Sequence, residues 1–310
     1  MKKLFCADLF CGGGGTSTGI SAFGESEEDM YRDAISQPLS QKVDAAVELI
    51  KLFGRDAIVC FSGGKDSLVI KDIARRAGVP HEVIYSVTTI DPPELIYYIR
   101  ENHPEIKWNR QPEPLLQHMV SKGKGLPTRL ARWCCERYKE NTGNGLCKII
   151  GVRAEESVRR KGLWKQVNAN RHGGIIIAPI VYWTDADVWR YIRENNLPYC
   201  KLYDEGFTRL GCIGCPLAGP RHQRKEFDRW PRFEKLWWQY TIKFWNKWHG
   251  VPRRDGGRRF FEDFQTPEAY FAWWLSGKAK EKNAQTEACA FDLFGEIPCD
   301  DDCQNKFMTV

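Results

Sequence analysis

The stretch from Ile58 to Ile70 constrains the fold of this chain more than any other. A short apolar run that ends at Phe61 leads into Ser-Gly-Gly-Lys-Asp-Ser, and an amphipathic segment from Leu68 to Ala77 follows at once. This order predicts a strand, a tight glycine turn and a helix. Free backbone N–H groups and the positive end of the helix dipole meet where the turn joins the helix, so the stretch is suited to binding an anion.

The side chains of this turn also suit an anion. The two glycines let the backbone approach a ligand without a Cβ in the way, and the lysine adds a mobile positive charge. An aspartate follows the lysine, whereas a Walker A loop has Ser or Thr there. The stretch resembles the PP-loop, the pyrophosphate-binding signature of the ATP pyrophosphatase and adenine nucleotide alpha-hydrolase superfamily; a turn that only joins two elements is the alternative. The resemblance implies that a nucleotide is bound by Ser62, Gly63, Gly64, Lys65, Asp66 and Ser67.

Strands and helices alternate along the chain on both sides of this turn. The patterns predict helices over 39–53, 68–77, 93–100, 114–121 and 185–195, and strands over 56–61, 81–87, 106–109, 146–152 and 175–180. The last two strands are nearly unbroken apolar runs, which are typical of buried parallel strands. Gly54 is placed to cap the first helix, and Thr184 and Asp187 form a capping-box pattern at the start of the last one. The sequence therefore predicts an α/β fold with three layers, a doubly wound and mainly parallel sheet of the adenine nucleotide alpha-hydrolase-like type, followed by a helical, Trp-rich C-terminal region.

Polar residues follow the strand predicted over 81–87. In a doubly wound sheet, ligands bind at the carboxyl ends of the strands. Thr89 and Asp91 are therefore expected to face the nucleotide. A helix start led by Pro92 and Pro93 is the simpler alternative for the same residues.

The N-terminal residues carry a different signal. Asp8 to Gly15 resembles the first motif of cytosine-C5 DNA methyltransferases, a strand and glycine loop that hold S-adenosylmethionine. The rest of that family's pattern is missing, and one strand with one loop cannot form a cofactor site, so we interpret the segment as a vestigial or fused fragment. The polar, acidic residues 25–38 are predicted to be a linker. The expected segments are 1–38 (fragment and linker), 39–220 (PP-loop domain), 221–280 (basic aromatic helical region) and 281–310 (polar tail with cysteines).

The net charge of +6 hides a strong asymmetry. Residues 121–172 contain 13 Lys or Arg against 4 Asp or Glu, and residues 221–259 contain 12 against 4. Such segregation favours an electropositive face that holds an anionic partner, either a nucleotide alone or a nucleic acid; charges scattered over a solvated surface are the alternative. No apolar run approaches the length of a membrane span and no signal peptide is recognisable, so a cytoplasmic protein without a membrane partner is expected.

Four of the 12 cysteines have a spacing that points to a metal. Cys134-Cys135 is followed, after 76 intervening residues, by Cys212-Ile-Gly-Cys215. A Cys-x-x-Cys turn beside glycines suits soft-metal binding, because both thiolates point one way and backbone amides can donate to the sulfurs. A vicinal pair suits the several irons of a cluster better than one tetrahedral ion. The arrangement resembles the [4Fe–4S] site of adenylyl-sulfate reductases; zinc and reduced core thiols remain the alternatives.

Three segments resemble proteins of the phosphoadenosine phosphosulfate (PAPS) reductase family. They are 151–157, which contains Gly-x-Arg-x-x-Glu-Ser, and the runs 179–192 and 197–212. The resemblance covers about residues 40–220 in the expected order. It implies that Arg153 and Arg209 contact the anionic part of the substrate, which agrees with guanidinium chemistry. With the loop residues Lys65 and Asp66, these are the candidate catalytic residues.

Two departures from the reductases favour ATP over PAPS or adenylyl sulfate. The chain lacks the C-terminal Glu-Cys-Gly-x-His segment that carries the reductases' nucleophile, and Cys289, Cys299 and Cys303 lie in an acidic tail. The turn also has the ATP-handling sequence, which the reductases usually alter. Both features resemble ATP-using sulfurtransferases of the DNA phosphorothioation or tRNA thiolation type.

The resemblance to such sulfurtransferases implies a reaction and its partners. The loop would hold pyrophosphate while an acceptor oxygen attacks the α-phosphorus of ATP, with Mg²⁺ neutralising charge, and sulfur would then displace the adenylate. The implied partners are an acceptor such as DNA or tRNA and a sulfur donor such as a cysteine desulfurase or a thioredoxin-like protein. Reduction of PAPS or adenylyl sulfate by an external thiol is the main alternative. A non-catalytic, cluster-bearing nucleic-acid-binding protein is the third.

Residues 221–249 interleave aromatic and basic side chains. This mixture can stack on and grip single-stranded nucleic acid. However, Phe233, Trp237, Phe244 and Trp248 recur at helical spacing, so a core stripe explains the aromatic residues equally well.

Overall fold

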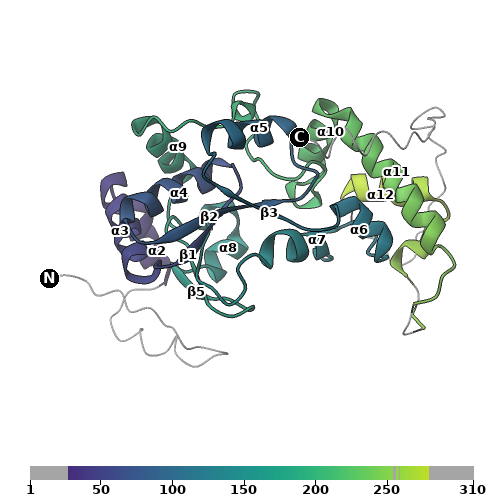
Figure 1. The fold of residues 1–310 in the computed structure, drawn as a ribbon, viewed down its shortest axis with the longest axis horizontal. Helices are drawn as coiled ribbons and strands as arrows, with labels where there is room; N and C mark the ends of the chain where they lie inside the picture. Colours follow the sequence, from purple (N-terminus) through teal and green to yellow (C-terminus); the bar gives the residue numbers. More distant parts are fainter. Residues whose placement is uncertain (1–26, 254–255, 258, 279–310) are drawn as a thin grey trace. The chain divides into compact units, whose positions relative to one another are not determined.

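The computed structural model describes residues 27–253, 256–257 and 259–278 (Figure 1). Contacts divide the chain into two compact units. The first contains the described residues up to Ser86 together with 93–109 and 141–210; the second contains 87–92, 110–140 and the described residues from Gly211 onward. The methyltransferase-like fragment and the cysteines of the tail lie outside the described residues. The segment boundaries expected from the sequence stay a prediction.

A mainly parallel sheet organises the first unit. Its strands, in the part of the chain that the structure describes, are β1 (Ala57–Phe61), β2 (His81–Val87), β3 (Lys107–Arg110), β4 (Lys148–Ile149), β5 (Val167–Ala169) and β6 (Ile175–Ile177), in the order β3-β2-β1-β4-β6-β5. β1 pairs in parallel with β2 and β4, and β4 pairs in parallel with β6. The register aligns Val59 with Val83 on one side and with Ile149 on the other, so one row of apolar side chains crosses the sheet.

Helices alternate with these strands along the sequence, as predicted. They are α2 (Glu27–Ser36), α3 (Leu39–Phe53), α4 (Lys65–Ala77), α5 (Pro93–Asn102), α6 (Leu115–Ser121), α7 (Trp133–Cys135), α8 (Val158–Leu163), α9 (Asp185–Glu194), α10 (Pro220–Arg229), α11 (Pro231–Trp248) and α12 (Pro267–Ser276). The capping box at Thr184 and Asp187 is present, and Gly54 ends α3. Of the helices within the described ranges, none has the length and apolar character needed to cross a membrane.

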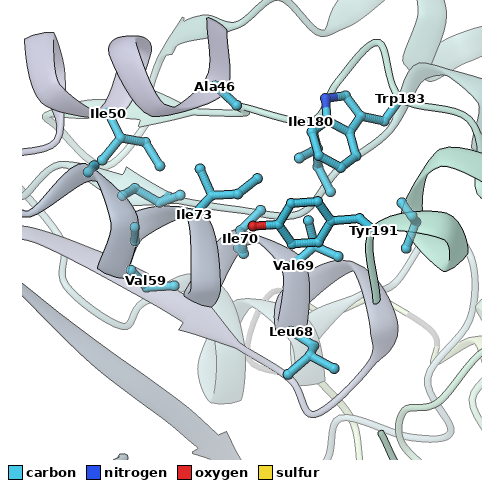
Figure 2. Packing of buried hydrophobic residues seen from close by; sticks show 14 of the residues in the cluster. Ala46, Ile50, Val59, Leu68, Val69, Ile70, Ile73, Ile180, Trp183 and Tyr191 are labelled. Atoms are coloured by element: carbon cyan, nitrogen blue, oxygen red, sulfur yellow. The ribbon is translucent and has the colours of Figure 1, made fainter. Parts of the chain in front are cut away.

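The core of the first unit lies where α3, α4 and α9 pack against the sheet (Figure 2). Ile50 of α3, Ile73 of α4 and Val59 of β1 are each fully buried in this cluster. Trp183 and Tyr191 also belong to this cluster, and their ring centroids lie 5.5 Å apart in edge-to-face contact. The Tyr191 hydroxyl donates a hydrogen bond of 2.7 Å to the buried Asp72 of α4 and thereby ties α9 to the helix that follows the glycine turn. The mainly parallel sheet and its helices confirm the predicted α/β fold class.

Two local predictions are wrong in detail, and one strand was not predicted. The stretch predicted to be a linker contains helix α2, which is stabilised because Tyr31 packs against Tyr182 at 6.0 Å. The strand predicted over 146–152 is only two residues long, since Leu146 is 50% exposed and the chain leaves the sheet after Ile149. The edge strand β5, which pairs antiparallel with β6, had no clear sequence signal.

The second unit is a helical assembly with an aromatic core. Three of the four stripe residues on α11 are buried, with Trp237 and Phe244 each 1% exposed, and Trp248 is half-buried. Trp237 packs against Trp274 of α12 at 4.8 Å, and Phe244 packs against Phe261 at 4.7 Å. The core interpretation of these aromatic residues is therefore correct. The indole group of Trp248 also points inward and donates to the Val120 carbonyl at 2.6 Å.

Candidate functional site

The glycine turn connects β1 to α4 as expected. Gly63 has a φ of 73°, and a Cβ there would lie 2.6 Å from the Leu95 side chain, so only glycine fits without rearrangement. Ser67 holds the turn closed, because its hydroxyl donates to the Gly64 carbonyl at 2.8 Å and accepts the Ser62 N–H at 3.1 Å. The turn thus has a fixed backbone that leads directly into the start of a helix.

Lys65, the first residue of α4, is only 6% exposed. Its Nζ lies 3.3 Å from a carboxylate oxygen of Asp66 and 3.3 Å from one of Asp185. It also donates to the Thr208 carbonyl at 3.4 Å. The oxygen atoms of these three residues therefore hold the lysine side chain inside the site and away from solvent.

Arg153 is the centre of the charged network, and it is 4% exposed. Its three nitrogens each contact a different carboxylate: Asp66 at 2.6 Å, Glu155 at 2.6 Å and Asp185 at 2.9 Å. Burial opposes the positive charge of Arg153, yet these carboxylates outweigh burial and raise its pKa. Gly151 makes the approach feasible, since a Cβ there would lie 2.9 Å from the Asp66 backbone.

Tyr203 and Asp185 join the site although sequence reasoning did not select them. The Tyr203 hydroxyl accepts the backbone N–H of Lys65 at 2.8 Å, and its ring packs edge-to-face on Trp189 at 5.0 Å. Tyr203 is thus the hydrogen-bond partner of one of the backbone amides at the start of α4. Asp185 is the first residue of α9, and its position beside the capping residue Thr184 was the only available signal. An acidic residue in the first turn of a helix usually indicates only helix stabilisation.

Arg209 differs from the other predicted residues of the first unit. It is exposed, and it makes no hydrogen bond or ion pair with any residue in the described part of the chain. The structure therefore brings Ser62–Ser67 and Arg153 together in one network and leaves Arg209 outside it. The roles assigned to these residues in binding and catalysis stay predictions.

Thr89 and Asp91 lie in the second unit, in a strained turn. Asp91 is 8% exposed and accepts the Thr88 N–H at 2.9 Å, while Thr89 has a φ of 67° and accepts the Leu115 N–H at 3.1 Å. A positive φ is unusual for a β-branched residue and costs energy that other contacts must offset. Both polar side chains thus stabilise the turn itself; their contact with a nucleotide stays a prediction.

The second unit also brings the four predicted cysteines into one region. Cys134 and Cys135 end α7, and a π-helical turn over Glu136–Glu140 follows them. Cys212 and Cys215 frame a tight turn. All four are free and half-buried, and the Cys212 thiol donates to the Thr88 hydroxyl at 3.4 Å. Single π-helical turns are frequent at functional sites.

The electrostatics of these cysteines involve a lysine that the sequence analysis did not select. The pKa of the Cys135 thiol is lowered to about 6, first by a hydrogen bond from Cys134 and then, against burial, by the charge of Lys139. Burial raises the pKa of the Cys212 thiol to about 11. When Cys212 is ionised, its charge raises the pKa of Lys139 against the opposing effect of burial. Lys139 is thus a cation placed among the predicted ligands.

Whether these residues fit a metal depends on whether the metal is a single ion or a cluster of several irons. Within residues 27–253, 256–257 and 259–278, no three or more His, Cys, Asp or Glu side chains gather closely enough to hold one metal ion. Cys134 nevertheless interacts electrostatically with Cys135, Cys212 and Cys215. The four thiols agree in number and ligand type with a [4Fe–4S] cluster, which is held by four Cys thiolates.

Comparison with known proteins identifies the family. A model of the phosphoadenosine phosphosulfate reductase domain matches residues 56–218, which is more than half of the chain. The chain belongs to this family. The matched range contains the glycine turn, Arg153, Arg209 and all four predicted cysteine ligands.

Several relatives of the chain have been described. Adenosine 5'-phosphosulfate reductase 2 of Bacillus subtilis is 28% identical over 218 residues, which cover 67% of this chain and 92% of that protein. An uncharacterized protein of Methanocaldococcus jannaschii is 31% identical over 213 residues, 64% of this chain, and the match spans only 42% of that longer protein. A PAPS reductase from Candida auris solved as a phosphate complex is 18% identical, with a TM-score of 0.44 over 61% of this chain and 95% of that one.

Proposed function

We propose that this family member is an enzyme that binds ATP at Ser62–Ser67, adenylates an acceptor and supports transfer of sulfur to it. The observation that carries the proposal is the intact Ser-Gly-Gly-Lys-Asp-Ser turn, whose lysine and aspartate are held by Arg153 and Asp185. The absence of a Glu-Cys-Gly-x-His segment from the sequence favours ATP over adenylyl sulfate. In the first step an acceptor oxygen attacks the α-phosphorus, and the bond to the bridging oxygen breaks as pyrophosphate leaves.

The charges of the network support a requirement for Mg²⁺. Lys65 and Arg153 carry two positive charges, and Asp66, Glu155 and Asp185 carry three negative ones. A triphosphate would bring further negative charge into a site that is already anionic, so a divalent cation is needed to offset it. Carboxylate oxygens of Asp66 and Asp185 are suitable ligands. The ion would stabilise the charge that develops on the leaving pyrophosphate.

The four cysteines support a [4Fe–4S] cluster as the sulfur-related part of the enzyme. Cys134, Cys135, Cys212 and Cys215 would hold the cluster, and Lys139 would offset part of its negative charge. The sulfur would come from an external donor, such as a cysteine desulfurase or a thioredoxin-like protein.

The surface of α10 and α11 supports a nucleic-acid acceptor such as DNA or tRNA. Glu226 and Glu234 are 4% and 6% exposed, so these helices direct two of their carboxylates inward. Their exposed residues, in contrast, include many cations, which suit a phosphate backbone: Arg221, Lys225, Arg229, Arg232, Lys235, Lys243 and Lys247.

Reduction of adenylyl sulfate is the second candidate, favoured by the relatives named adenosine 5'-phosphosulfate reductase. In that reaction two electrons from an external dithiol would cleave the sulfur–oxygen link, with release of sulfite and AMP and formation of a disulfide in the donor.

One assay separates these functions. The full chain is incubated with ATP, Mg²⁺ and duplex DNA or tRNA, and pyrophosphate release is measured. We expect release that the acceptor stimulates and that Lys65→Ala lowers by about 100-fold. Arg190→Ala is the matched control, because Arg190 is an exposed cation of the same unit paired with Glu194. Release of sulfite from adenylyl sulfate with thioredoxin and without ATP would support the second candidate and contradict the first. An iron-free protein after anaerobic purification would contradict the cluster.

A further inference from the structure

Side chains of α10 and α11 hold the backbone of the Cys212–Cys215 turn. The Gly214 N–H donates to a carboxylate oxygen of Glu226 at 2.8 Å, and the Gly214 carbonyl accepts from the Gln223 amide at 2.9 Å. The Trp237 indole donates to the Ile213 carbonyl at 3.1 Å. Gln223 and Glu226 are three residues apart on α10 and therefore share one face of the helix.

These contacts are made in the interior of the second unit. Gln223 is 2% exposed, Glu226 is 4% exposed and Trp237 is 1% exposed. A buried polar group is costly unless it has a partner, so each of these side chains strongly favours the position of its backbone partner. The two peptide groups in the middle of the turn are thus fixed by residues outside the turn.

Gly214 shows how closely the helices surround the turn. Its φ is 77°, and a Cβ there would lie 2.6 Å from the Phe227 ring and 2.7 Å from the Trp237 indole nitrogen. On the other side, the Ile213 N–H donates to the Ile90 carbonyl at 2.8 Å. The turn is therefore held from both sides, while Cys212 and Cys215 stay half-buried at its ends.

We infer that Gln223, Glu226 and Trp237 are positioning residues that fix the orientation of Cys212 and Cys215. The inference rests on the proposed function of these cysteines as ligands. The Gly214 N–H is a donor of the kind that often binds sulfur in Cys-x-x-Cys turns, and here Glu226 accepts it instead. The buried part of the Trp-rich region thus has a function of its own: it fixes the backbone that carries Cys212 and Cys215.

Alkylation of the metal-free full chain by iodoacetamide tests this inference residue by residue. Reaction rates at Cys212, Cys215, Cys134 and Cys135 are followed by mass spectrometry. Gln223→Ala and Trp237→Phe are expected to speed the reaction at Cys212 and Cys215 by about fivefold, as expected for loss of one hydrogen bond, and to leave Cys134 and Cys135 unchanged.

Trp274→Phe is the matched control for Trp237→Phe. Trp274 is 3% exposed in the same aromatic core and donates its indole N–H to the Pro127 carbonyl at 2.7 Å, away from the turn. It should leave the rates at Cys212 and Cys215 unchanged. Equal acceleration in both tryptophan variants would mean general loosening of the unit and would overturn the inference, as would no acceleration in either Trp237→Phe or Gln223→Ala.

Two substitutions at Glu226 test whether an acceptor for the Gly214 N–H is enough to keep the alkylation slow. Glu226→Gln keeps an acceptor for the Gly214 N–H, and its new amide can face His222, whose Nε2 lies 3.2 Å from the carboxylate. Rates near those of the unmodified chain are expected for Glu226→Gln and faster rates for Glu226→Ala; equal rates in the two variants would contradict the inference. Iron uptake is measured in parallel. If no variant and no parent protein takes up iron, the cluster proposal fails, while the alkylation pattern still decides the positioning function.

Discussion

The glycine turn of the first unit and the cysteine turn of the second unit are held in opposite ways. In the first, the functional candidates are partners of one another: Lys65 and Arg153 bind Asp66 and Asp185 directly. In the second, the thiols are positioned indirectly, because Glu226 and Trp237 bind only the backbone between them. The glycine turn belongs to a network of charged side chains. The cysteine turn has a backbone that other residues fix, and its thiols take no part in those hydrogen bonds.

This difference predicts different responses to a ligand. A nucleotide that bound at the glycine turn, as proposed, would exchange existing ion pairs for new ones, so binding and stability would be coupled there. A metal group at the cysteine turn would bind sulfur atoms, and these take no part in the hydrogen bonds from Gln223, Glu226 and Trp237. Substitutions in the first site should therefore change stability and binding together, whereas substitutions around the second should change thiol geometry with the charges left intact.

The largest expected effect is that of Arg153→Ala. It removes a buried cation that three carboxylates share, and the carboxylates left behind repel one another. We expect the free energy of unfolding, measured by urea denaturation of the full chain, to fall by about 3 kcal/mol, together with loss of ATP binding. Arg190→Ala, which removes an exposed ion pair, should cost less than about 0.5 kcal/mol. A stable Arg153→Ala protein that still binds ATP would show that the charges do not couple stability to binding.

The next effect concerns acid stability of the first unit. The pKa of His103 is lowered to about 4, first by burial and then by Lys71. Tyr98 donates to the Pro198 carbonyl, so its oxygen accepts from His103 Nε2 and the other ring nitrogen accepts from Lys71 at 2.9 Å. These two hydrogen bonds need a neutral His103 ring, because one ring nitrogen must donate and the other must accept.

The sign of the pH effect follows from the unfolded pKa of about 6.5. As pH falls from about 6.5 towards 4, His103 becomes protonated in the unfolded chain but stays neutral in the folded chain. The free energy of unfolding therefore falls over this window, by at most about 3 kcal/mol. The measurement is the free energy of unfolding against pH for the parent and for His103→Gln. The variant should show a shallower loss; identical slopes would show that the histidine does not contribute.

A pair of glycine substitutions compares the two turns directly. Gly214→Ala would place a Cβ against an aromatic ring and an indole, with a φ of 77°, and should cost about 2 kcal/mol. Gly63→Ala meets only the flexible ends of Leu95 and Ile99 and should cost less. Gly78→Ala has a φ of 69° and nothing within 4 Å, so it reports the backbone cost alone, about 1 kcal/mol. Thermal unfolding checks this order, and an equal loss at all three sites would refute the tight frame around Gly214.

The sequence was informative where the signal was local. The strand, glycine turn and helix at 57–77 followed from apolar spacing and two glycines, and the capping box at Thr184 followed from residues three apart. The same local reasoning failed at α2, because its stability comes from a contact between Tyr31 and Tyr182, which are far apart in the chain.

The candidate site was only partly predictable for the same reason. Asp185 and Tyr203 reach the start of α4 from more than 100 residues away, so no spacing rule connects them to Lys65. Gln223 and Glu226 looked like ordinary polar residues in a basic helix until their burial and their backbone partner were known. Motifs pointed to the candidate groups, while the residues that contact them depend on tertiary packing.

The smallest expected effect comes from Tyr203→Phe, and it examines how a nucleotide enters the charged site. The hydroxyl accepts the Lys65 N–H at 2.8 Å, which is one of the amides an anion would need. Without the hydroxyl this amide loses its hydrogen-bond partner, and a phosphate can supply one. We expect ATP and pyrophosphate to bind about fivefold more tightly to the variant, measured by isothermal titration calorimetry. Weaker binding would mean that the hydroxyl contacts the nucleotide and stays in the occupied site. In that case the first site too would contain a fixed frame, and the contrast between the two turns would be smaller than the contact between Tyr203 and Lys65 indicates.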